Sequence, residues 1–138
     1  MCESRTKIVL VEDTVVLRES VKTILGEIPN LVVCGEYESV REAIEGIDRI
    51  GPDVVVLDIG LKTGNGLDVL RYLNQVHPHC RVLVFSNRVD RYYREEALLW
   101  GASHVFNKFT ESEQLFDAVA AIVVSRPHPQ QSRSILDV

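Results

Sequence analysis

The chain has 138 residues, 46% of them hydrophobic, and a formal net charge of −5, which suits one domain with one core. The acidic balance argues against a nucleic-acid-binding surface, because phosphate contacts need basic side chains, and the apolar runs are too short to cross a bilayer. The N-terminus lacks the apolar core of a secretory signal and the three cysteines show no CxxC spacing, so we expect a cytoplasmic protein with reduced thiols, no membrane insertion and no direct nucleic-acid binding.

The first part of the chain predicts two strands and two helices. The apolar run KIVLV, residues 7–11, indicates a buried strand that ends on two acids, Glu12 and Asp13. An amphipathic helix follows, and LVVCGEY, residues 31–37, predicts a second strand. A capping box at residues 39–42 opens a second helix, which the Gly51–Pro52 pair ends.

The stretch DVVVLDIGLKTGNG, residues 53–66, is the centre of the sequence. Its unbroken apolar run, residues 54–57, favours a strand that is buried on both faces. The run ends on Asp58, and three glycines among the next eight residues predict a sharp turn. An aspartate at a strand end can simply bond its own loop, so this stretch alone leaves a structural and a functional role equally open.

The second part of the chain continues the alternation. A third amphipathic helix precedes Pro78, and RVLVFS, residues 81–86, predicts a strand that ends on Ser86. A helix from about residue 90 to 100 and a short strand at 104–106 lead to Lys108. A capping box at 110–113 opens the last helix. The polar, proline-containing composition after Val124 predicts a disordered tail over residues 126–138, which leaves one domain over residues 5–125.

Five strands that alternate with five helices predict an α/β fold with a doubly wound, mostly parallel sheet covered on both faces. In such sheets, ligands bind outside the carboxyl ends of the strands. The polar residues that follow the predicted strands should therefore meet at one edge of the sheet. These residues are Glu12, Asp13, Asp58, Ser86 and Lys108.

The chemistry of that edge favours phosphoryl transfer. Three carboxylates placed together need a cation to stay ionised, and ligands that are all oxygen favour Mg²⁺. A lysine and a serine hydroxyl suit phosphoryl oxygens, and a carboxylate can serve as the nucleophile, here Asp58. Taken singly, Glu12 and Asp13 could only cap the first helix and Lys108 could be a solvated lysine, so the interpretation depends on the whole set.

The chain resembles a receiver domain of the bacterial two-component response regulators over about residues 5–125. The matching motifs, in order, are VLVED, VVVLDIGLKTGNGLDVL, VLVFS and GASHVFNK. The resemblance implies the flavodoxin-like strand order 2-1-3-4-5. It also implies that Asp58 accepts a phosphoryl group from the phosphohistidine of a sensor histidine kinase or a histidine phosphotransfer protein, and that a downstream protein then responds.

The resemblance further implies a role for each residue of the site. Glu12, Asp13, Asp58 and the Gly60 backbone carbonyl would bind Mg²⁺, while Ser86 and Lys108 would hold the phosphoryl oxygens.

The sequence departs from the family pattern at several positions. Lys62 and Phe109 stand where receivers commonly have proline, and we expect a trans peptide bond before Phe109 because a cis bond there costs about 2.5–4 kcal/mol. The usual aromatic switch position holds Val105, with Phe106 one place later. The usual switching mechanism of receivers, in which an aromatic side chain at this position changes its rotamer on phosphorylation, is therefore in doubt for this chain.

We expect a phosphorylation-controlled signalling domain and not an enzyme. If the chain is the whole gene product, 138 residues leave no room for an output domain, and the sequence then predicts a single-domain response regulator. The proline and glutamine content of the tail leaves a linker to a further domain open, and a homodimer also stays open. The alternative is a Mg-dependent aspartyl-phosphate hydrolase of the haloacid dehalogenase type, but those enzymes carry a second acid two residues after the nucleophile, where this chain has Gly60. A flavin site fits the fold, but the first turn is acidic where a phosphate cradle is needed.

In receivers, the positions that hold Gly60 and Arg88 flank the water that hydrolyses the acyl phosphate. Glycine has no side chain to orient this water, and arginine cannot act as a base because its guanidinium stays protonated. We therefore expect a long-lived phosphorylated form.

Overall fold

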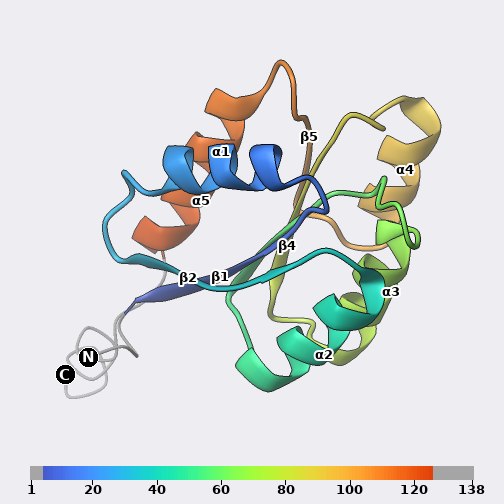
Figure 1. Cartoon of the computed structure of the whole chain (residues 1–138), viewed down its shortest axis with the longest axis horizontal. Helices are drawn as coiled ribbons and strands as arrows, with labels where there is room; N and C mark the ends of the chain where they lie inside the picture. The colour runs from blue at the N-terminus through green and yellow to red at the C-terminus, as the bar shows by residue number, and fades with distance from the viewer. Residues whose placement is uncertain (1–4, 126–138) are drawn as a thin grey trace, which may run out of the picture.

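The computed structural model describes residues 5–125 and confirms the predicted fold (Figure 1). The strands are all parallel to their neighbours and lie in the order β2-β1-β3-β4-β5. The elements along the chain are β1 (Thr6–Val11), α1 (Val15–Leu25), β2 (Leu31–Tyr37), α2 (Val40–Ile50), β3 (Val54–Leu57), α3 (Gly66–Val76), β4 (Arg81–Ser86), α4 (Arg91–Leu99), β5 (His104–Asn107) and α5 (Ser112–Ser125).

The tail predicted for residues 126–138 lies outside the described residues, and the domain boundaries at 5 and 125 stay predictions. Among the described residues, no helix has both the length and the apolar character needed to cross a membrane.

Helices cover both faces of the sheet, with α1 and α5 on one face and α2, α3 and α4 on the other (Figure 1). Successive strand residues point to opposite faces, so β3 sends Val54 and Val56 toward α1 and α5, and Val55 and Leu57 toward the other three helices. All four are buried. This arrangement explains why the central strand is an unbroken apolar run rather than an alternating one.

Local capping agrees with the sequence at α2 and differs at α5. The Ser39 hydroxyl accepts a hydrogen bond from the Glu42 N–H at 3.2 Å, and Gly51 ends α2 in the left-handed region with φ 63°. The predicted capping box at 110–113 is wrong. Helix α5 begins at Ser112, and Glu111 caps it, because the Glu111 carbonyl accepts from the Leu115 N–H at 3.1 Å. The predicted box lies one residue too early.

The parallel ladder continues past the strands and aligns the residues that follow them. The Asp58 N–H donates to the Val11 carbonyl at 3.0 Å, and the Lys108 N–H donates to the Ser86 carbonyl at 3.1 Å. Helix α3 starts against this edge, because a Cβ atom at Gly66 would lie 2.3 Å from the Asp58 carbonyl oxygen. Only glycine permits that close approach. These backbone contacts thus set the positions from which the side chains at this edge of the sheet project.

Candidate functional site at the carboxyl edge of the sheet

Asp58 follows the last residue of β3, and three donors hold its buried side chain. Its Oδ1 atom accepts from the Ser86 hydroxyl at 2.7 Å and from the Gly60 backbone N–H at 3.0 Å. Its Oδ2 atom accepts from Lys108 Nζ at 2.9 Å. Both carboxylate oxygens therefore have a fixed orientation at the centre of the edge.

Lys108 bridges two buried carboxylates, because its Nζ atom also donates to Glu12 Oε1 at 2.9 Å. Burial raises the pKa of Glu12 and outweighs the hydrogen bond from Lys108, and the nearby negative charge of Asp58 raises it further. Burial by itself would lower the pKa of Lys108, but the hydrogen bonds and charges of Glu12 and Asp58 together outweigh burial and raise it. Lys108 therefore stays charged at neutral pH and compensates the two acids.

Asp13 is the half-buried acid of the site, and it is held from the loop after β3. Its Oδ2 atom accepts from the Lys62 backbone N–H at 2.6 Å. A proline at position 62, which is common in receivers, would have no N–H to donate. The departure from the family pattern at Lys62 therefore supplies a hydrogen bond to a predicted metal ligand.

The donor set of the acids fits a divalent cation that prefers oxygen. One carboxylate oxygen from each of Glu12, Asp13 and Asp58 lies within 4.8 Å of the other two. Glu12 is further oriented by the Thr14 N–H, which donates to its Oε2 atom at 3.0 Å. These three acids could hold a metal ion. The Gly60 carbonyl remains a predicted ligand.

Arg18, one turn into α1, fixes the backbone of the acidic segment. Its Nη1 atom donates to the Glu12 carbonyl oxygen at 2.6 Å. The same guanidinium pairs with Glu36, at 3.1 Å, and with Glu38, at 3.1 Å, at the end of β2, and its side chain is only 12% exposed. Arg18 thus ties the loop after β1 to the neighbouring strand, and the position of Glu12 depends on it.

Arg88 lies beside Gly60 at the rim of the site. A Cβ atom at Gly60 would approach Arg88 Nε to 3.3 Å, so the arginine side chain fills the space that a side chain at position 60 would take. The Arg88 N–H donates to the Ser86 hydroxyl at 3.1 Å, and its guanidinium lies 5.8 Å from the centre of the Tyr93 ring. The two positions predicted to flank the approach of water are therefore in contact.

The position that usually holds the aromatic switch residue is filled by a packed aliphatic side chain. Val105 is buried in the core beneath α4, and its carbonyl accepts from Arg94 Nη1 at 3.1 Å. Phe106 is buried on the opposite face, where it stacks on His104 with ring centres 5.3 Å apart. Both side chains are buried, on opposite faces of the sheet. The bond before Phe109 is trans as expected, since no cis peptide bond occurs in residues 5–125.

The structure brings every predicted site residue to one edge, while sequence reasoning missed three groups that orient them. These groups are the Thr14 N–H, the Arg18 guanidinium and the Lys62 N–H. The missing proline at position 62 was a usable signal for the third. For Arg18 there was none, because its spacing within α1 does not reveal a contact with β2.

Comparisons with known proteins agree with this geometry. A family model described as the response regulator receiver domain matches residues 8–120. The chain is 31% identical over 136 residues to the transcriptional regulatory protein DegU of Brevibacillus brevis, and the match covers 97% of this chain and 58% of DegU. It is 35% identical over 120 residues to the DNA-binding transcriptional activator DevR/DosR of Mycobacterium tuberculosis, covering 87% and 55% of the two chains.

Among solved structures, a LuxR-family two-component response regulator from Aurantimonas sp. SI85-9A1 superposes with a TM-score of 0.80. The two are 26% identical, and the match covers 96% of each chain.

These relatives correct one expectation drawn from the composition. The net charge of −5 was expected to mean no direct nucleic-acid binding, yet DevR/DosR is named a DNA-binding activator. Net charge does not decide the question, because phosphate contacts depend on a local basic surface and not on the balance of a whole sequence. The chain spans little more than half the length of the two curated relatives. It belongs to the response regulator receiver family, whose members act as phosphoacceptor signalling switches.

Proposed function

We propose that Asp58 is the phosphoacceptor of this receiver and takes its phosphoryl group from a protein phosphohistidine. The observation that carries the proposal is the hydrogen bonding of Asp58, with Ser86 on one carboxylate oxygen and Lys108 on the other. Any phosphoryl group that forms on Asp58 would start within reach of both donors. Such an arrangement suits a reaction in which positioning and charge neutralisation supply most of the catalysis.

In the proposed step, an Asp58 oxygen attacks the phosphorus of the donor. An O–P bond forms, the P–N bond to the donor imidazole breaks, and the imidazole leaves with the electron pair of that bond. Ser86 and Lys108 then turn their hydrogen bonds from the free carboxylate to the phosphoryl oxygens. Lys108 gives up part of its contact with Asp58 and remains paired with Glu12, so its charge stays compensated throughout.

We assign the metal site to Mg²⁺, held by Glu12, Asp13, Asp58 and the Gly60 carbonyl. The proposal is supported by the all-oxygen donor set and by the spacing of the three carboxylates. When bound, Mg²⁺ neutralises the negative charge that the phosphoryl group adds to this acidic edge. The protein contributes the orientation of the acids, through Thr14 and Lys62.

We propose that the chain is a signalling module without enzymatic turnover of its own, apart from slow loss of its phosphoryl group. Some relatives are enzymes. One, a protein-glutamate methylesterase/protein-glutamine glutaminase of Pyrococcus horikoshii, is 39% identical over 74 residues, and the match covers 20% of its length. DegU and DevR/DosR are instead named transcriptional regulators, and we therefore propose control of transcription as the output. The hydrolase alternative is disfavoured because Gly60 offers no second acid. The cytoplasmic location stays a prediction.

Phosphorylation with a small acyl phosphate tests the proposal. In Mg²⁺ the full chain should gain one acid-stable, base-labile phosphoryl group by intact mass. Asp58→Asn should gain none, and EDTA should abolish the gain, because the acids then lack their cation. Asp117→Asn, which removes an exposed acid of α5, is the matched control and should be labelled normally. Equal labelling of Asp58→Asn, or undiminished labelling in EDTA, would refute the assignment.

A further inference from the structure

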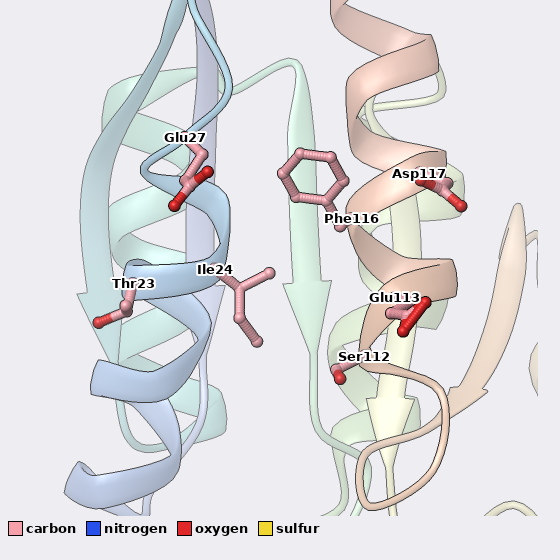
Figure 2. A pocket seen from close by; sticks show the side chains of 7 residues that line it. All are labelled: Thr23, Ile24, Glu27, Ser112, Glu113, Phe116 and Asp117. Atoms are coloured by element: carbon pink, nitrogen blue, oxygen red, sulfur yellow. The ribbon is translucent and has the colours of Figure 1, made fainter.

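A groove lies between α1 and α5 (Figure 2). These two helices cover the face of the sheet opposite α2, α3 and α4 (Figure 1). Its volume is about 470 Å³. Figure 2 shows Ile24 of α1 and Phe116 of α5 facing each other across it. A second hollow of about 300 Å³ shares Glu27 and Phe116 with the first and extends it toward the ends of both helices. The two adjacent hollows are together called the α1–α5 groove, which the proposed phosphorylation site does not use.

The α1–α5 groove is apolar in its floor and acidic at its rim. Three carboxylates line it, from Glu27 on one side and from Glu113 and Asp117 on the other, and all three residues are exposed. No lysine or arginine occurs among the described residues that line either hollow. A ligand of this groove should therefore combine apolar side chains with positive charge. Two copies of the groove would instead bring like charges together.

The sequence that follows α5 has that character. Helix α5 ends at Ser125, and Val123 and Val124 line the end of the groove nearest to it. The next thirteen residues, 126–138, read RPHPQQSRSILDV and carry two arginines against one aspartate. Two adjacent apolar residues, Ile135 and Leu136, follow the second arginine by two and three places. The segment thus offers positive charge that suits the acidic rim and apolar side chains that suit the floor.

The segment is also long enough to return along the groove. Helix α5 has 14 residues, which corresponds to about 21 Å at 1.5 Å per residue. The ten residues from 126 to 135 reach up to about 33 Å when extended. Prolines at positions 127 and 129 disfavour continuation of the helix. Reversal of the chain after Ser125 therefore brings Ile135 within reach of Phe116.

We propose that residues 126–138 dock in the α1–α5 groove of their own chain, with Arg126 and Arg133 at the acidic rim and Ile135 and Leu136 on the apolar floor. The contact covers the outer face of α1 and α5 and is independent of phosphorylation of Asp58.

A nitroxide on the segment tests the proposal in the full chain. Ser134→Cys carries the label in a background with Cys2→Ser and Cys34→Ser. Cys80 can stay, because burial raises its thiol pKa to about 12 and keeps the thiol protonated at neutral pH. Broadening of ¹⁵N-labelled backbone amides by the nitroxide then maps where the segment lies.

The expected result is strong loss of amide signal at Ile24 and Phe116, with the Leu99 amide of α4 unaffected. Reversal of the segment charges by Arg126→Glu with Arg133→Glu should restore most of the lost signal. No preferential loss at the groove, or loss that survives the charge reversal, would overturn the proposal.

Two controls separate docking within one chain from other origins of the signal. Glu113→Lys with Asp117→Lys should reduce the broadening, whereas Glu45→Lys on α2 should leave it unchanged, since that acid lies on the other face of the sheet. Unlabelled ¹⁴N chains that carry the nitroxide are also mixed with nitroxide-free ¹⁵N chains. Broadening in that mixture would assign the docked segment to a second copy and overturn the intramolecular proposal.

Discussion

Replacement of Lys108 by methionine should destabilise the metal-free domain more than any other lysine substitution at this edge. The side chains of Lys108, Glu12 and Asp58 are 5%, 8% and 4% exposed. Removal of one partner from a buried ion pair typically costs about 3–5 kcal/mol, because the other charge is left uncompensated. The Glu12 carboxyl can relieve part of this by protonation, since burial already raises its pKa. We therefore expect the free energy of unfolding to fall by an amount near the lower end of this range, about 3 kcal/mol.

Urea unfolding in EDTA measures this loss, with Lys62→Met as the matched control. Lys62 is exposed, so its substitution should change the free energy of unfolding by no more than about 0.5 kcal/mol. Added Mg²⁺ should restore stability to Lys108→Met, because a cation that binds only the folded state stabilises it by mass action. In an Asp58→Asn background the loss should be smaller, because one of the two unpaired charges is gone. A loss as small as that of Lys62→Met, or the same loss in both backgrounds, would refute this account of the site.

The remaining predictions concern lifetime, switching and metal binding. Gly60→Asn and Gly60→Glu should shorten the life of the phosphorylated form, because each supplies a side chain that can orient water and must displace Arg88; an unchanged decay rate by intact mass would place the control elsewhere. Val105→Ala should retain phosphorylation-dependent binding of a partner while Ser86→Ala weakens it, and the reverse pattern in a binding titration would contradict the absence of a swinging ring. Arg18→Met should lower Mg²⁺ affinity about tenfold by calorimetry, since groups that orient metal ligands have effects of that order; an unchanged affinity would show that Glu12 holds its position without Arg18.

Much of the fold could be predicted because its signals are local. The unbroken apolar runs predict buried parallel strands, and Ser39 and Gly51 mark the two ends of α2. The start of α5 was misplaced by one residue. There, the Glu111 carboxylate accepts from the Asn107 N–H at 2.8 Å and fixes the turn before the helix. That bond depends on the preceding loop as well as on the helix sequence.

The members of the site were predictable, but their mutual contacts were not. The rule that parallel strands bring their carboxyl ends together is enough to group Asp58 with Glu12 and Lys108. The bridge that Lys108 makes between the two acids joins residues 50 and 96 positions apart. Such bonds depend on how side chains pack after folding, which periodicity does not encode. The same holds for Arg18, whose partners lie on a different strand.

The most direct test of the central claim is the chemical location of the phosphoryl group. Borohydride reduces an aspartyl phosphate to homoserine, which marks the acceptor position permanently, and tandem mass spectrometry then identifies it. After phosphorylation of the full chain in Mg²⁺, homoserine should occur at position 58 and at no other aspartate. Homoserine at Asp13, or a phosphorylated chain in which Asp58 is unmodified, would contradict the account.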